Sequence, residues 1–119
     1  MRYNMNDALL VWKPNSEYVI TGESYDGLVW VSSDIKPTEK EITAKVTELN
    51  NAEPMRLLRV ERDKRLAACD WRASSDLTLT DPWKTYRQAL RDLPASASPK
   101  LDNYAELDLS SVTFPTEPT

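Results

Sequence analysis

The single cysteine is the residue whose type best suits nucleophilic chemistry. Cys69 follows Leu66 along one face of a predicted helix that also carries Arg62 and Arg65, and nearby cations lower the pKa of a thiol and make it reactive. A small buried side chain that continues the apolar line of Leu66 is the simpler interpretation, and we adopt it. One cysteine also excludes an intramolecular disulfide and the usual cysteine-rich zinc sites.

Other residue types that catalysis commonly needs are scarce. The chain has no histidine, so it lacks the commonest general base, the commonest metal ligand and the middle member of a Ser-His-Asp arrangement. Its two glycines, Gly22 and Gly27, cannot form a phosphate-binding glycine loop. Carboxylates are plentiful, but spacing in the sequence cannot show whether two of them face each other across a cleft. The sequence therefore predicts a protein that is not an enzyme and uses no metal or cofactor.

Basic residues gather in the middle of the chain. Residues 51–93 carry nine Lys or Arg against seven Asp or Glu, within a chain whose net charge is -4. Trp71 is available to stack on a base, but the acidic residues between and around these cations would compete with nucleic-acid phosphates. The pattern favours a solvated helix surface whose charges pair locally, and it predicts no nucleic-acid partner.

Length and hydropathy indicate a small globular protein. With 119 residues, 40% of them hydrophobic and 29% charged, the chain is sized for one modest core. No apolar run approaches the roughly 20 residues that cross a bilayer, and residues 1–10 lack the features of a signal peptide. We expect no membrane partner and a cytoplasmic location.

The first third of the chain predicts a β-hairpin. Residues 17–21 and 27–32 are rich in β-branched and aromatic side chains, and the turn-forming segment 22–26 separates them. A two-stranded ribbon is marginally stable alone, so we expect a helix, a third strand or a partner to cover it. The preceding apolar run, residues 8–12, fits either one buried strand or a helical turn, because periodicity cannot decide over so short a segment.

A helix is predicted to start after the hairpin. Thr38 and Glu41 have the spacing of a capping box. The apolar stripe of this helix consists of Ile42, Val46 and Leu49. Because two asparagines weaken a helix and Pro54 cannot donate a backbone hydrogen bond, we expect a break or kink at residues 50–54.

Two further helices are predicted, over residues 53–68 and from Pro82 to just before Pro94. Asp81 is the expected cap of the last helix, with Pro82 in its first position. Two amphipathic helices joined by a short connector should form an antiparallel helical hairpin. The apolar side chains expected between them are Leu58, Leu66, Trp71, Trp83, Tyr86, Leu90 and Leu93.

These elements predict an α+β fold in three parts. An N-terminal β-hairpin region (1–36) precedes a mainly helical region with an antiparallel helical hairpin (37–94) and an extended, polar, proline-rich tail (95–119). The tail is too polar to form a core of its own. Its loosely alternating apolar side chains suit an added edge strand or a groove on a partner. They are Leu107, Leu109, Val112 and Phe114.

Three segments together resemble phage tail assembly chaperone proteins. Residues 59–71, RVERDKRLAACDW, resemble that family's Arg-x-x-Arg-Asp helix leading into Asp-Trp. Residues 83–94, WKTYRQALRDLP, are similar to its Tyr-Arg-Gln-Ala-Leu-Arg-Asp helix ending in proline. Residues 112–115 are similar to its apolar-aromatic-proline ending, with Phe114 where Trp is usual. The resemblance covers residues 54–116, and residues 28–50 more weakly resemble the front part of small tail-fibre assembly proteins.

The resemblance implies a non-enzymatic protein that binds a phage tail or tail-fibre protein during virion tail assembly, in the cytoplasm of the infected bacterial host. The alternative is a structural virion component, such as a small tail, fibre or surface subunit, that remains in the particle. Association with a second copy of the chain stays open. We expect Arg62 and Arg87 each to reach a carboxylate such as Asp70 or Asp76. The candidates for hairpin core or partner binding are Trp71, Trp83, Tyr86, Leu90, Arg62 and Arg87.

Overall fold

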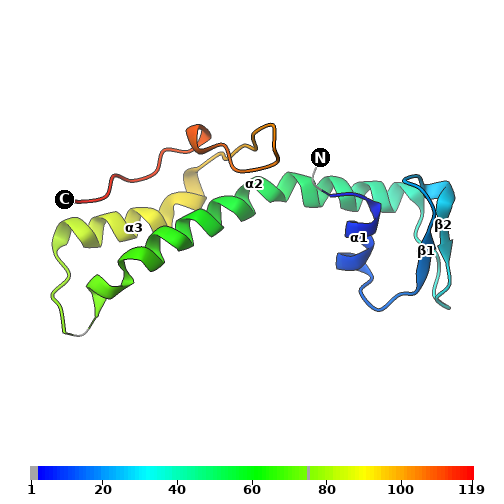
Figure 1. Cartoon of the computed structure of the whole chain (residues 1–119), viewed down its shortest axis with the longest axis horizontal. Coiled ribbons are helices and arrows are strands. Elements are labelled where there is room, and N and C mark those ends of the chain that lie inside the picture. The colour runs from blue at the N-terminus through cyan, green and yellow to red at the C-terminus, as the bar shows by residue number, and fades with distance from the viewer. Residues whose placement is uncertain (1–2, 75) are drawn as a thin grey trace. The chain divides into compact units, whose positions relative to one another are not determined.

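The computed structural model describes residues 3–74 and 76–119, and it has the predicted α+β architecture. The main elements are α1 (Met5–Trp12), β1 (Tyr18–Ile20), β2 (Leu28–Trp30), α2 (Glu39–Cys69) and α3 (Asp81–Ser96) (Figure 1). Short 3-10 turns occupy Tyr25–Gly27, Asp70–Ala73 and Leu109–Ser111. The chain divides into two compact units, Met1–Ala52 and Glu53–Thr119. This boundary lies inside α2.

The short apolar run near the N-terminus is a helix. Asn4 caps α1: its side chain accepts a hydrogen bond from the Asp7 amide, and the Asp7 carboxylate accepts one from the Asn4 amide, both at 3.0 Å. This reciprocal pair satisfies two backbone donors that a helix N-terminus otherwise leaves unpaired. Leu9, one turn further on, is completely buried, so capping and burial together favour the helical turn over the strand.

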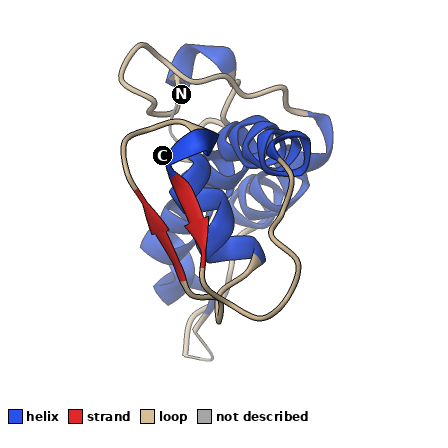
Figure 2. Cartoon of the chain, turned by 90° about the vertical axis from the view of Figure 1, so that its right-hand side faces the viewer, coloured by secondary structure: helices blue, strands red, loops and turns tan. Residues whose placement is uncertain are grey.

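The predicted β-hairpin is confirmed (Figure 2). Strands β1 and β2 pair antiparallel, with Ile20 opposite Leu28 and Tyr18 opposite Trp30. The rings of Tyr18 and Trp30 stack across the strands, with centroids 5.7 Å apart and planes 2° from parallel. Leu28 on the same face is buried together with Leu9 of α1 and Ile42 of α2, so both helices cover this face and supply what a two-stranded ribbon lacks.

The opposite face of the hairpin is open. Val19, Val29 and Val31 each expose more than half of their surface, at 55%, 58% and 57%. Side chains alternate between the two faces of a strand, so the burial of Leu28 necessarily turns its valine neighbours outward. The covered face is therefore the one that carries Leu28.

Helix α2 begins at the predicted capping box. The Thr38 amide donates to Glu41 Oε1 and the Glu41 amide donates to Thr38 Oγ1, both at 3.1 Å. The Thr38 backbone and side-chain hydrogen bonds hold the pKa of the Glu41 carboxyl below its usual value, because they stabilise the charged form.

The predicted break at residues 50–54 is wrong, because α2 continues through Pro54 to Cys69; the alternative of a kink there stays a prediction. Proline deprives a helix of one hydrogen bond to the carbonyl four residues earlier. Packing on both sides of that position offsets the loss: Ile42 exposes 3% and Leu58 exposes none of its surface. Local propensity is overridden by burial of the helix face.

Helix α3 runs antiparallel to the second half of α2, as the predicted helical hairpin requires (Figure 1). Its N-cap residue is Thr80, one position before the predicted Asp81. It also continues past Pro94 to Ser96, contrary to the predicted end. Pro94 lies in the last turn of α3, where its missing N–H costs the helix the one hydrogen bond that would reach the Leu90 carbonyl.

The segment after α3 folds back over the second unit. Leu101 and Leu107 form an isolated antiparallel bridge, and the Asp108 side chain caps the 3-10 turn that follows. The last residues then lie alongside α3 (Figure 1). Among residues 3–74 and 76–119, no helix combines the length and the apolar character that a membrane span needs.

Candidate partner-binding site

The core of the second unit lies between α2 and α3. Trp83, Tyr86 and Leu90 of α3 are buried with Cys69 of α2, and Leu66 packs against them. Trp83 and Tyr86 meet edge to face, with ring centroids 5.5 Å apart and planes at 89°, the geometry that aromatic quadrupoles prefer. Three of the six candidate residues are therefore buried in the core of the helical hairpin.

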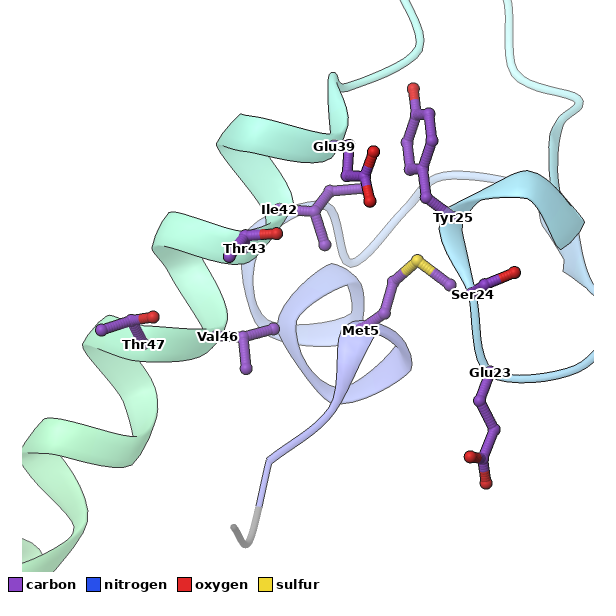
Figure 3. A pocket seen from close by; sticks show the side chains of 9 residues that line it. All are labelled: Met5, Glu23, Ser24, Tyr25, Glu39, Ile42, Thr43, Val46 and Thr47. Carbon is purple, nitrogen blue, oxygen red and sulfur yellow. The ribbon is translucent and has the colours of Figure 1, made fainter.

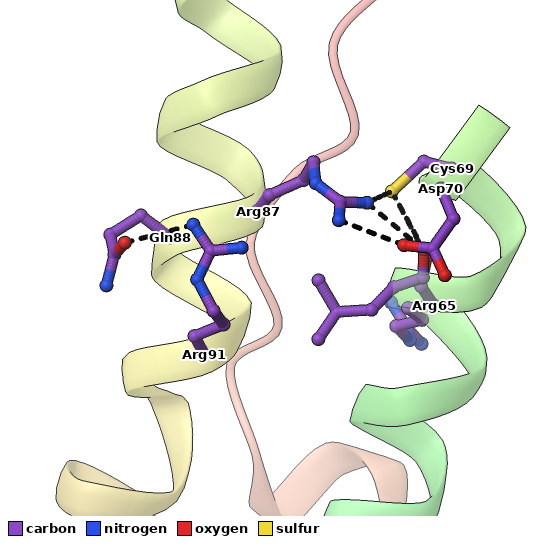
Figure 4. Close-up of polar contacts among 7 residues, drawn as sticks. Arg65, Cys69, Asp70, Arg87, Gln88 and Arg91 are labelled. Atoms are coloured by element: carbon purple, nitrogen blue, oxygen red, sulfur yellow. Dashed lines mark hydrogen bonds and ion pairs between the residues drawn. The ribbon is translucent and has the colours of Figure 1, made fainter. Parts of the chain in front are cut away.

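Arg87 ties the two helices together (Figure 4). Its Nη2 donates to Asp70 Oδ1 at 2.9 Å, and its Nη1 donates to the Leu66 carbonyl at 3.2 Å and to Cys69 Sγ at 3.1 Å. Burial by itself disfavours the charged guanidinium, but the hydrogen bonds to Asp70 and Cys69 outweigh it and raise the pKa of Arg87. The expected contact between Arg87 and Asp70 is present.

Arg62 does not make the contact expected of it. It pairs with its neighbour Asp63, with Nη2 2.8 Å from Oδ1, and reaches neither Asp70 nor Asp76. The reason is its position. Asp63 is adjacent in the chain and exposed, so pairing with it costs less side-chain conformational entropy than reaching a carboxylate two helical turns away.

Cys69 is a structural residue. It exposes 3% of its surface, and its thiol contacts the Arg65 and Leu66 carbonyls, each at 3.4 Å, as well as Arg87. A nucleophile has to be reached by its substrate, and this thiol is covered. The burial supports the small apolar core residue adopted from the sequence.

Trp71 is not a core residue, contrary to the expectation from the sequence. It exposes 58% of its surface, because the chain leaves α2 at Cys69 and turns through the 3-10 segment Asp70–Ala73. The Arg72 guanidinium lies over both tryptophans, 4.4 Å from the Trp71 ring centroid and 4.0 Å from that of Trp83. Trp83 is buried and Trp71 is exposed, so Arg72 links the outer indole to the core.

The C-terminal aromatic residue belongs to the same site. Phe114 packs against the buried cluster between the helices, and the Arg65 guanidinium lies 3.9 Å from its ring centroid. Sequence reasoning missed this contact and the Arg72 stack. The signal available for Phe114 was its place in an apolar-aromatic-proline ending; for Arg72 the sequence offered only its position next to Trp71.

The first unit carries a pocket of about 250 Å³ beside α1 and α2 (Figure 3). Met5, Ile42 and Val46 form its apolar part. Glu23 and Glu39 also line it, but the Glu23 side chain points away from Glu39, so the pocket does not present two facing carboxylates. Within residues 3–74 and 76–119, no group of three or more Cys, Asp or Glu side chains lies close enough to hold a metal ion.

Comparison with known proteins identifies the second unit. The family model described as phage tail assembly chaperone protein matches residues 55–119, more than half of the chain, and the chain belongs to this family. The family indicates a role in phage tail assembly. No curated protein and no solved structure matches the chain.

Proposed function

We propose that this member of the phage tail assembly chaperone family binds a tail or tail-fibre polypeptide during assembly, and that Trp71 is the centre of its binding surface. The observation that carries the proposal is the exposed indole at the end of the helical hairpin, 58% exposed and stacked on Arg72. Tryptophan and arginine are the residue types most enriched among those that dominate binding energy at protein interfaces.

The contacts of Trp71 favour binding in a second way. Arg72 holds the indole while its own guanidinium is fixed against buried Trp83. A side chain that is already ordered loses less conformational entropy when a partner covers it. Val60 and Leu77 of the same unit are also about half exposed, at 54% and 49%, and they add apolar surface for a partner to cover.

The mechanism follows from this surface. Tail proteins awaiting assembly expose apolar segments that associate wrongly unless they are covered. A small protein that offers an exposed aromatic residue on a rigid helical hairpin covers such a segment, and it is released when the segment reaches its place in the tail.

Binding is tested with the purified tail and tail-fibre proteins of the same phage, each titrated against the full chain by isothermal calorimetry. Trp71→Ala should weaken binding to the partner by tenfold or more, roughly 1.4 kcal/mol. The control is Tyr104→Ala, which removes an aromatic side chain that is 85% exposed in the same unit. Equal affinities for wild type and Trp71→Ala would refute the assignment of the surface.

Release is tested on purified particles. Quantitative mass spectrometry should find the protein absent or far below the copy number of the tail subunits. A fixed copy number in finished particles would instead identify it as a structural subunit of the virion and would contradict release.

A further inference from the structure

The C-terminal strap, residues 113–119, is held differently from the rest of the second unit. The last backbone hydrogen bond before it runs from the Val112 amide to the Leu109 carbonyl at 3.3 Å. Between residues that the structure describes, no hydrogen bond involves the strap. Its attachment therefore depends on side-chain packing, and a segment attached in this way opens at lower cost than one in a backbone ladder.

One side chain anchors the strap. Phe114 packs against the cluster of Cys69, Trp83, Tyr86 and Leu90. Arg65 covers the outer face of the ring at 3.9 Å, and Arg65 itself is held by Glu61, with Nε 3.1 Å from Oε1. Together the cluster and the guanidinium form a socket that fits an aromatic ring.

The rest of the strap lies along α3 without filling the space beside it. A groove lined by Pro82, Thr85 and Ala89 on the helix side is bordered by residues 115–119 on the other. Burial raises the pKa of the Tyr86 phenol, and the nearby Glu117 carboxylate raises it further, as expected for a strap that passes close to this ring.

We propose that the strap occupies a docking groove on α2 and α3, and that an extended partner segment carrying one aromatic side chain displaces it. The strap itself defines the chemistry of the occupant: an extended backbone, an aromatic ring in the socket under Arg65, and proline beside it. The inference deepens the proposed function, since the partner would be a tail polypeptide with such a segment.

The test uses a fluorescein-labelled peptide with the sequence of residues 108–119 as the probe. In the full-length Phe114→Ala protein the socket has lost its internal competitor, so the peptide should bind about tenfold to a hundredfold more tightly than it binds wild type. The same peptide carrying Phe114→Ala should bind neither protein. Fluorescence anisotropy gives both affinities. If the alanine variant does not fold, Phe114→Leu replaces it; leucine is a weaker anchor than phenylalanine, so the peptide should bind this variant more tightly than wild type, with a smaller gain.

Cys69 provides a second measurement. Because Phe114 packs against the cluster that contains this thiol, a weakened strap should raise the rate of Cys69 modification by Ellman's reagent by a similar factor. Tyr104→Ala, an exposed aromatic change in the same C-terminal region, should leave the rate unchanged. Melting curves of all variants separate strap opening from loss of the fold.

Equal peptide affinity for wild type and Phe114→Ala, or no binding to Phe114→Ala, overturns the proposal. If the groove instead receives the strap of a second copy, wild type will dimerise with rising concentration in light scattering, and the partner assignment is overturned. The two proposals can fail separately. If Trp71→Ala weakens tail-protein binding but Phe114→Ala does not change peptide binding, the proposed function stands and the strap proposal is refuted. If Phe114→Ala raises peptide affinity but Trp71→Ala does not weaken tail-protein binding, the Trp71 surface is refuted and the docking groove stands.

Discussion

Leu90→Ala is the sharpest test of the helical hairpin. Leu90 exposes none of its surface and lies in the cluster formed by Cys69, Trp83 and Tyr86. Shortening it to alanine removes buried apolar groups and leaves a cavity whose neighbours are large rings that cannot move in freely. Substitutions of this kind cost about 2 to 5 kcal/mol of unfolding free energy.

The chain supplies a matched control. Leu109 in the same unit is 55% exposed, so Leu109→Ala makes the same chemical change with less apolar area to lose and no enclosed cavity. Its cost should stay below about 1 kcal/mol. Because both variants make the same Leu-to-Ala change, the difference between their unfolding free energies measures the effect of burial alone.

Urea unfolding followed by far-ultraviolet circular dichroism measures both values. For a denaturant slope of about 1 to 3 kcal/mol per molar, a loss of about 3 kcal/mol lowers the midpoint by about 1 M or more. If Leu90→Ala and Leu109→Ala shift the midpoint by the same small amount, α2 and α3 are not packed through Leu90 and the description of the core is refuted.

Three further changes test individual contacts. Arg87→Lys cannot keep all three hydrogen bonds to Asp70, Cys69 and the Leu66 carbonyl and should cost about 1 to 3 kcal/mol of unfolding free energy, whereas Arg91→Lys on the exposed side of α3 should cost almost nothing. Glu41 has a pKa below its ordinary value of 4.5, so its stabilising effect is present above that pH and is lost as the pH falls through the lowered value. The unfolding free energies of wild type and Glu41→Gln should therefore converge in acid. A difference that stays constant with pH would contradict the capping box. Pro54→Ala restores a backbone donor inside α2 and should raise stability by up to about 3 kcal/mol, which urea midpoints will show.

Short-range signals in the sequence predicted most of the fold. The capping box at Thr38 and Glu41 and the apolar spacing of Trp83, Tyr86 and Leu90 are local patterns, and the structure contains the helices they predict. The errors occurred where a local rule competed with packing. Pro54 marks a helix end by its chemistry, yet burial of the helix on either side keeps α2 continuous.

The candidate site was harder to predict because it depends on where the chain turns. The sequence predicted that Trp71 packs in the core of the helical hairpin, but the 3-10 turn after Cys69 brings it to the surface. The Arg65 and Phe114 contact joins residues 49 positions apart, and no local pattern encodes such a distance. The Arg87 and Asp70 pair was predictable because a helical hairpin brings those positions together.

Each compact unit contains its own tyrosine and tryptophan pair in a distinct geometry: Tyr18 and Trp30 are nearly parallel, and Trp83 and Tyr86 are nearly perpendicular. Near-ultraviolet circular dichroism reports fixed aromatic packing, so the two units carry separate optical signals. Trp30→Phe silences the indole signal of one pair and Trp83→Phe that of the other. The melting of either half can thus be followed in the intact chain without an added dye.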